Sequence, residues 1–156
     1  MTKEIERKFL VTGDFKKHVI KRYKIAQGYL SVAPERTVRI RIRDQQGFIT
    51  IKGIGNTSGT TRFEWEKEIP VIEAENLLLL CEPSTIEKIR HIVPANDNLY
   101  FEVDEFFGEN EGLIIAEIEL PHESTNFIRP SWLGEEITGK LKYYNASLSK
   151  KSFSNW

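Results

Sequence analysis

Charged residues recur at every second position in separate stretches of this 156-residue chain, with mostly apolar residues between them. A spacing of two is the period of a β-strand, so each stretch places charges on one face and hydrophobic side chains on the other. The stretches are 4–8, 39–43, 62–66, 88–90, 102–104 and 117–119. If these strands share a sheet, their charged faces combine into one surface that holds both cations and carboxylates.

The same alternation predicts eight strands, and the short turns between them favour antiparallel pairing. The predicted fold is mainly β (α+β), a closed eight-stranded antiparallel β-barrel with a few peripheral helices. The polar, glycine-rich segment 53–61 is expected to be a loop. The predicted strands are 3–11, 25–32, 36–44, 47–53, 61–69, 86–93, 98–105 and 113–121, and the predicted helical segments are 14–18, 72–81 and 142–151.

The apolar residues between the charges form a second face. An apolar barrel interior with a charged exterior would explain the alternation, but it leaves unexplained why cations and anions are segregated strand by strand. We therefore expect the charged residues to face a water-filled tunnel and the apolar set to pack outward against helices and the C-terminal segment. This apolar set is Ile5, Ile40, Ile42, Ile49, Ile51, Phe63, Trp65, Ile89, Phe101, Val103, Ile118 and Leu120.

Composition narrows the class of protein. Charged residues make up 29% of the chain, but the net charge of −1 provides no general attraction to nucleic acid or to an anionic membrane. The length fits a single domain, 1–156. The charged N-terminal segment, the lack of a long apolar run and a single cysteine lead us to expect a cytoplasmic protein with no membrane segment. The sequence leaves a homodimer open.

The acidic pairs are candidate metal ligands. Glu4 and Glu6 lie on one strand face about 7 Å apart, close enough to share a hard cation. Glu117 and Glu119 repeat this arrangement. Carboxylates without a supporting cluster of Cys or His favour Mg²⁺ or Mn²⁺ over zinc. For one pair alone a salt-bridged strand face is the simpler explanation, and the neighbouring arginine strand is what favours a metal site.

Basic residues on the same predicted faces supply the opposite charge. An arginine fork can hold two phosphate oxygens at once, and lysine adds a point charge. A nucleic-acid surface is the alternative, but the interleaved glutamates would repel a nucleic-acid backbone. We therefore expect a small polyphosphate. The candidate phosphate-binding residues are Lys8, Arg39, Arg41, Lys52, Arg62, Lys88 and Arg90.

The opening E-x-E-x-K motif, Glu4 to Lys8, resembles the N-terminal signature of the CYTH domain proteins, also called triphosphate tunnel metalloenzymes. The resemblance covers nearly the whole chain in order. One departure is Lys140, which stands where that family usually has an acidic residue. The other matching segments are 27–30, 38–41, 50–52, 62–66, 87–90, 101–104, 117–120 and 132–138, with Tyr143 and Asn145.

This resemblance implies an eight-stranded tunnel that binds a triphosphate with a divalent metal. The family includes inorganic triphosphatases, thiamine triphosphatases, class IV adenylate cyclases and RNA 5′-triphosphatases, so the fold alone leaves the reaction open. We expect hydrolysis of inorganic tripolyphosphate to pyrophosphate and phosphate. Thiamine triphosphatase, adenylate cyclase and a non-catalytic polyphosphate-binding module are the alternatives.

The implied roles can be assigned residue by residue. The expected catalytic residues are Glu4, Glu6, Lys8, Lys52, Glu64 and Glu66. Lys142 joins the phosphate-binding residues named above. The expected ligands of Mg²⁺ or Mn²⁺ are Glu4, Glu6, Glu117, Glu119 and Asp104. Phosphoryl transfer depends mainly on positioning and on charge stabilisation, so the chain needs no protein nucleophile.

Overall fold

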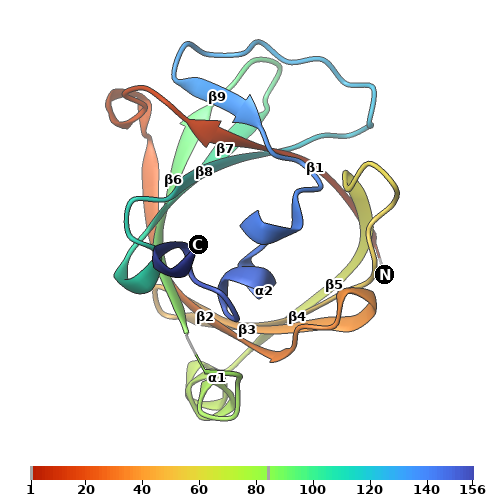
Figure 1. Cartoon of the computed structure of the whole chain (residues 1–156), viewed down its shortest axis with the longest axis vertical. Coiled ribbons are helices and arrows are strands. Elements are labelled where there is room, and N and C mark those ends of the chain that lie inside the picture. The colour runs from red at the N-terminus through yellow and green to blue at the C-terminus, as the bar shows by residue number, and fades with distance from the viewer. Residues whose placement is uncertain (1, 84) are drawn as a thin grey trace.

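The computed structural model describes residues 2–83 and 85–156, and its strands form a single antiparallel sheet that curls into a ring (Figure 1). The strand order is β5-β4-β3-β2-β6-β7-β8-β1-β9. The strands are β1 (Thr2–Val11), β2 (Lys21–Ser31), β3 (Thr37–Arg43), β4 (Gln46–Lys52), β5 (Thr61–Ile69), β6 (Ile86–Pro94), β7 (Tyr100–Phe106), β8 (Ile114–Glu119) and β9 (Leu133–Glu136).

Pairing between β1 and β5 closes the barrel. Residues Thr2 to Ile5 of β1 pair with Glu64 to Thr61 of β5, while the later part of β1 pairs with β8. The expected closed eight-stranded antiparallel barrel is confirmed. The short strand β9 is an addition that the alternation did not predict. It pairs with the end of β1 through Phe9 and Val11.

An apolar cluster, here called the outer core, covers the outside of β1, β6, β7 and β8. The segment between β8 and β9 folds over this face, where Phe127 packs edge-on against the rings of Phe9 and Phe101. This arrangement agrees with the expectation that apolar strand residues pack outward. The outer core consists of Phe9, Phe15, Val93, Phe101, Val103, Ala116, Ile118, Leu120, Trp132 and Leu133.

The outside of β4 and β5 is different because its apolar residues remain accessible. Ile51, Phe63 and Trp65 are 40%, 48% and 39% exposed. The expectation that the whole apolar set would be covered is therefore wrong for these residues. Alternation orients a side chain outward, but only a covering segment removes it from water.

The helices occupy opposite sides of the barrel wall. Helix α1 (Val71–Leu78) lies outside, close to Gly47 of β4, where an added Cβ would come within 2.7 Å of Ala74 Cβ. Helix α2 (Asn145–Leu148) lies inside the ring (Figure 1). The expected helix at 142–151 is thus shorter than predicted and internal rather than peripheral. Within the described residues, no helix has the length and apolar character needed to cross a bilayer.

A second cluster, here called the inner core, involves α2. Leu148 is fully buried against Tyr29, Ile86 and Ile115. These three strand residues share the inward parity of Gln27, Lys88 and Glu117. One part of the barrel interior is therefore packed with apolar side chains, and the charged interior is confined to the remainder. The inner core consists of Tyr29, Ile86, Phe106, Leu113, Ile115, Ile137 and Leu148.

Covered and uncovered regions of the outer face of the barrel can be compared with one residue type. Ile118 is fully buried in the outer core, whereas Ile51 is 40% exposed. We expect Ile118→Ala to lower the free energy of unfolding by about 2–5 kcal/mol, because it leaves a cavity. Ile51→Ala should cost less than half as much. Denaturant unfolding measures both, and equal losses would show that the outside of β4 is also covered.

Candidate active site

The barrel encloses a cavity of about 660 Å³, and about half of the residues that line it are charged. Its side chains come from all eight barrel strands, from the loop after β4 and from the segment that leads into α2. The expected site residues that line it are Glu4, Glu6, Lys8, Arg39, Arg41, Lys52, Arg62, Glu64, Glu66, Lys88, Arg90, Glu117 and Glu119. Residues that are far apart in the sequence thus share one wall.

Strand register sets like charges opposite one another on the acidic side. Glu6 of β1 faces Glu119 of β8, and Glu117 of β8 faces Glu102 of β7. Directly opposed like charges destabilise a sheet. This part of the wall therefore favours a cation between the carboxylates.

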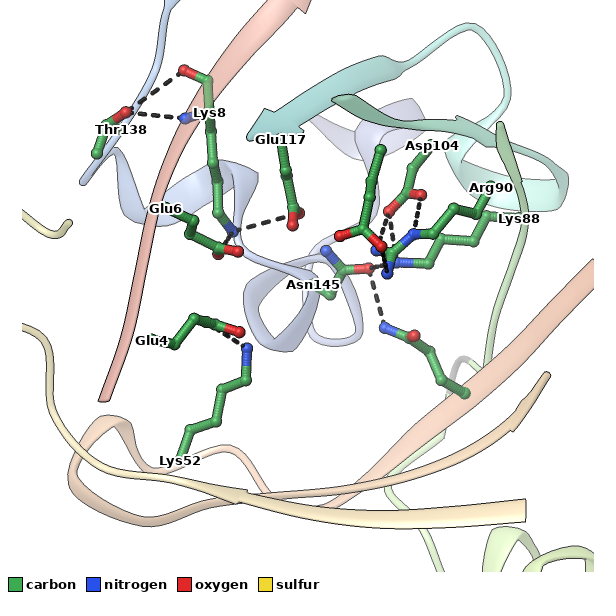
Figure 2. A network of polar contacts seen from close by, with 12 residues as sticks. Glu4, Glu6, Lys8, Lys52, Lys88, Arg90, Asp104, Glu117, Thr138 and Asn145 are labelled. Carbon is green, nitrogen blue, oxygen red and sulfur yellow. Dashed lines mark hydrogen bonds and ion pairs between the residues drawn. The ribbon is translucent and has the colours of Figure 1, made fainter. Parts of the chain in front are cut away.

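Two lysines lie among these carboxylates (Figure 2). The Lys8 Nζ atom is 3.7 Å from Glu6 and 3.8 Å from Glu117. The Lys52 Nζ atom donates a 2.9 Å hydrogen bond to Glu4. In the residues that the structure describes, no three His, Cys, Asp or Glu side chains come close enough together to hold a metal ion. In this arrangement lysine ammonium groups provide the local positive charge.

Glu6 and Glu117 face the same lysine but respond in opposite ways. Burial, together with repulsion by Glu117 and Glu4, raises the pKa of Glu6 to about 8. Burial also acts to raise the pKa of Glu117, but the charges of Lys8, Arg90 and Lys88 hold that pKa well below its usual range. The ionised form of Glu6 is therefore poorly stabilised in the structure, whereas that of Glu117 is well stabilised.

The basic side of the cavity is organised by Glu66. Its Oε2 atom is 3.4 Å from Nη2 of both Arg39 and Arg41, and it accepts a 2.7 Å hydrogen bond from Thr50. One carboxylate is thus shared by two guanidinium groups. Burial, with repulsion by Arg39 and Arg90, lowers the pKa of Arg41. The buried Nε atoms of Arg39 and Arg41 also have no hydrogen-bond partner among the described residues. This side of the cavity therefore favours an added anion.

Asp104 lies on the inward side of β7, beside the cavity rather than in its lining. It is 1% exposed. Arg90 donates from Nε and Nη2 to its two oxygens at 2.8 and 2.9 Å, and Lys88 Nζ is 2.7 Å away (Figure 2). These contacts occupy the oxygens that the expected metal-ligand role requires. In the structure Asp104 therefore orients two cations, and its role as a metal ligand stays a prediction.

Lys88 is nearly fully buried in this network. Burial, opposed by the charge of Asp104 and reinforced by that of Arg90, lowers the pKa of Lys88 to about 8. A buried ammonium group of this kind is stabilised by an added anion.

Lys142 does not join the cavity. Its side chain is exposed, and its Nζ atom lies 4.5 Å from the centre of the Trp156 ring. The sequence predicted a phosphate contact here, but the chain turns between Leu141 and Tyr143 and directs this residue outward.

Several cavity residues lie outside the predicted set. Thr50 holds Glu66, and the Tyr144 ring lies 4.5 Å from the Lys8 Nζ atom. Asn145 accepts hydrogen bonds from Gln27 and Lys88. Thr50 could have been found, since it shares the inward parity of Lys52. Strand parity gives no signal for Tyr144 or Asn145, because their positions depend on the turn that brings the C-terminal segment into the barrel; Asn145 was named only as part of the family resemblance.

The donor set is suited to a hard divalent cation. Glu4, Glu6, Glu117 and Glu119 all line the cavity and offer only carboxylate oxygens, which suit Mg²⁺ and Mn²⁺. The raised pKa of Glu6 is consistent with this choice, because a bound cation would stabilise its ionised form.

Comparisons with known proteins agree with this geometry. A model of the CYTH domain matches residues 2–153. An inorganic triphosphatase of Acetivibrio thermocellus is 45% identical over 157 residues, covering 100% of this chain and 99% of the relative. An inorganic triphosphatase of Nitrosomonas europaea is 36% identical over 152 residues, which cover 94% of this chain and 96% of the relative. The crystal structure of the inorganic triphosphatase NE1496 is similar with a TM-score of 0.68 and 33% identity, covering 96% of this chain and 95% of that one.

Glu6 and Glu117 form a matched pair for a stability test. In metal-free protein at pH 7, Glu6→Gln should raise Tm by at least about 3 °C, or roughly 1 kcal/mol, because it removes a carboxylate whose pKa is raised on folding. Glu117→Gln should lower Tm, because the folded state stabilises that carboxylate in its ionised form. Calorimetry measures both variants. A lower Tm for Glu6→Gln would contradict the electrostatics described here.

Arg90 offers a second comparison, since it contacts one buried and one exposed carboxylate. Asp104→Asn should destabilise the protein by about 3–5 kcal/mol, because Arg90 and Lys88 lose a buried counter-charge. Glu102 is 3.3 Å from Arg90, but its side chain is 38% exposed. Glu102→Gln should therefore cost less than about 1 kcal/mol. Denaturant unfolding distinguishes the two, and similar losses would mean that Asp104 is not the main support of Arg90.

Proposed function

Because this chain belongs to the CYTH family, we propose that it hydrolyses inorganic tripolyphosphate to pyrophosphate and phosphate. The observation that carries the proposal is the divided cavity wall, with two guanidinium groups that share one carboxylate on one side and opposed carboxylates on the other. The first side is suited to phosphate oxygens, and the second to a divalent metal bound to them. Two relatives named inorganic triphosphatase match this chain over nearly its full length.

In this proposal the basic residues of the cavity bind the phosphate chain. Arg39 and Arg41 line the cavity, and their guanidinium groups would bind oxygens of the substrate. Glu66 orients both guanidinium groups, and Asp104 orients Arg90. Such fixed cations stabilise negative charge that grows in the transition state, and they need little reorganisation to do so. The residues proposed to contact phosphate are Lys8, Arg39, Arg41, Lys52, Arg62, Lys88 and Arg90.

Glu4, Glu6 and Glu119, with Glu117, are the residues that would hold Mg²⁺ or Mn²⁺. Triphosphatases of this family depend on a metal ion. The metal, when bound, supplies Lewis-acid stabilisation of the phosphoryl oxygens. For the glutamates to bind it, Glu6 must lose its proton and Glu4 must exchange its contact with Lys52. Lys8 and Lys52, which contact these carboxylates in the structure, would then be able to bind phosphate.

The aromatic residues of the cavity argue against a nucleotide cyclase. A cyclase must hold the base and the sugar so that the ribose oxygen meets the α-phosphate. In the described part of the chain, the aromatic residues that line the cavity are Tyr29 and Tyr144. Tyr29 is buried in the inner core, and the Tyr144 ring is contacted by Lys8 and Arg62. Both rings thus already make packing or cation contacts, which disfavours their stacking on an adenine.

The proposal predicts a clear substrate preference. With Mg²⁺ or Mn²⁺, purified protein should cleave tripolyphosphate at least about tenfold faster than ATP in kcat/KM, which is about 1.4 kcal/mol of transition-state discrimination. Excess chelator should abolish turnover. Phosphate release and chromatography of the products measure both effects, with thiamine triphosphate as a third substrate. The proposed hydrolase activity would be refuted if ATP gave mainly cyclic AMP and pyrophosphate, at a rate above that of tripolyphosphate cleavage.

A further inference from the structure

Asn145 is the first residue of α2 and lines the cavity, where it joins two strands through its side chain. Its Oδ1 atom accepts hydrogen bonds of 2.9 Å from Lys88 Nζ on β6 and from Gln27 Nε2 on β2. A neutral residue is thus connected directly to the charged wall of the site. None of the roles assigned above uses it.

The orientation of this amide follows from its partners. An ammonium group donates hydrogen bonds and accepts none, so the atom of Asn145 that faces Lys88 must be the oxygen. The Gln27 atom that faces the same oxygen must in turn be the NH₂ group. Lys88 therefore sets the direction of both amides. The Nδ2 group of Asn145 is left with no partner among the described residues, and Figure 2 shows it pointing away from Lys88 toward the side of Glu117 and Lys8.

This arrangement leaves a polar group of Gln27 unsatisfied. Gln27 is fully buried, and its Oε1 atom has no hydrogen-bond partner among the residues described. Such an atom costs about 1–3 kcal/mol of stability. A flipped Gln27 would change which of its atoms is unpaired, but it would turn an oxygen toward the Asn145 oxygen. The network thus keeps the Asn145 amide in one orientation and leaves the Gln27 Oε1 atom without a hydrogen bond.

We propose that Asn145 contacts the substrate, with its Nδ2 group donating a hydrogen bond to a phosphate oxygen of tripolyphosphate. The inference rests on the proposed function, because it takes the cavity as the phosphate site. A neutral donor held in position adds a hydrogen bond without further charge repulsion among the cations of the wall. It also links substrate binding to α2, which forms part of the barrel interior.

A purely structural role for Asn145 would be limited to its contacts with Lys88 and Gln27. Asn145→Asp separates the two roles, because the carboxylate keeps an acceptor for both partners but loses the NH₂ donor. The control is Ser147→Asp, which places the same negative charge two residues later, on the same helix and in the lining of the same cavity. Any effect common to both variants reports added charge alone.

We expect both variants to fold, with the Tm of Asn145→Asp equal to or above that of the wild type, because Lys88 gains a charged partner. The KM for tripolyphosphate should rise at least tenfold more in Asn145→Asp than in Ser147→Asp. Where the wild type binds without turnover, the Kd from titration calorimetry replaces KM. Equal effects in the two variants would overturn the role of Asn145.

The wild-type reaction tests the proposed function separately. Binding of tripolyphosphate without hydrolysis would refute the proposed activity, while the comparison of the two variants would still decide the contact. If the wild type neither binds nor cleaves tripolyphosphate, both the activity and the Asn145 contact are refuted.

Discussion

The burial of many charges of both signs inside one small barrel is the constraint on which the rest of this structure depends. An ionised group removed from water is costly unless opposite charge and hydrogen bonds replace its hydration. Here the replacement is incomplete. Glu6 lies opposite Glu119, and Arg41 shares one carboxylate with Arg39. The wall therefore favours an added cation on one side and an added anion on the other.

Such an interior requires support from outside the cavity. The outer core buries apolar residues on the far side of β1, β6, β7 and β8, the strands that carry the acidic pairs and Arg90. The inner core packs part of the barrel interior and confines the charged region. Asp104 provides a third support, since it holds Arg90 and Lys88 from a position beside the cavity lining. Apolar burial and these fixed ion pairs offset the cost of the buried, incompletely paired charges in the site.

The same imbalance explains how the site can act on a polyphosphate. Cations that are already held in position and only partly paired give up few contacts when they bind phosphate oxygens. They also need not reorganise in the transition state. Burial and neighbouring carboxylates raise the pKa of Glu6, and Glu4 is paired with Lys52, so an added cation would stabilise the ionised form of Glu6. The protein without ligand is thus less stable to unfolding than it would be with balanced charges in the cavity. Such a loss of stability is common at binding and catalytic sites.

The alternation of charges determined much of this protein by itself, because the period of a strand is a local property. It predicted β5 with its observed limits, the inward row of Arg39 and Arg41, and the carboxylate chemistry of Glu4 and Glu6. Tertiary structure decided which rows oppose one another, as in the register of β1 with β8 and its closure with β5. It also directed Lys142 outward, left Asp104 out of the cavity lining and brought α2 with Asn145 inside. These outcomes depend on contacts between distant segments, and a two-residue period holds no information about such contacts.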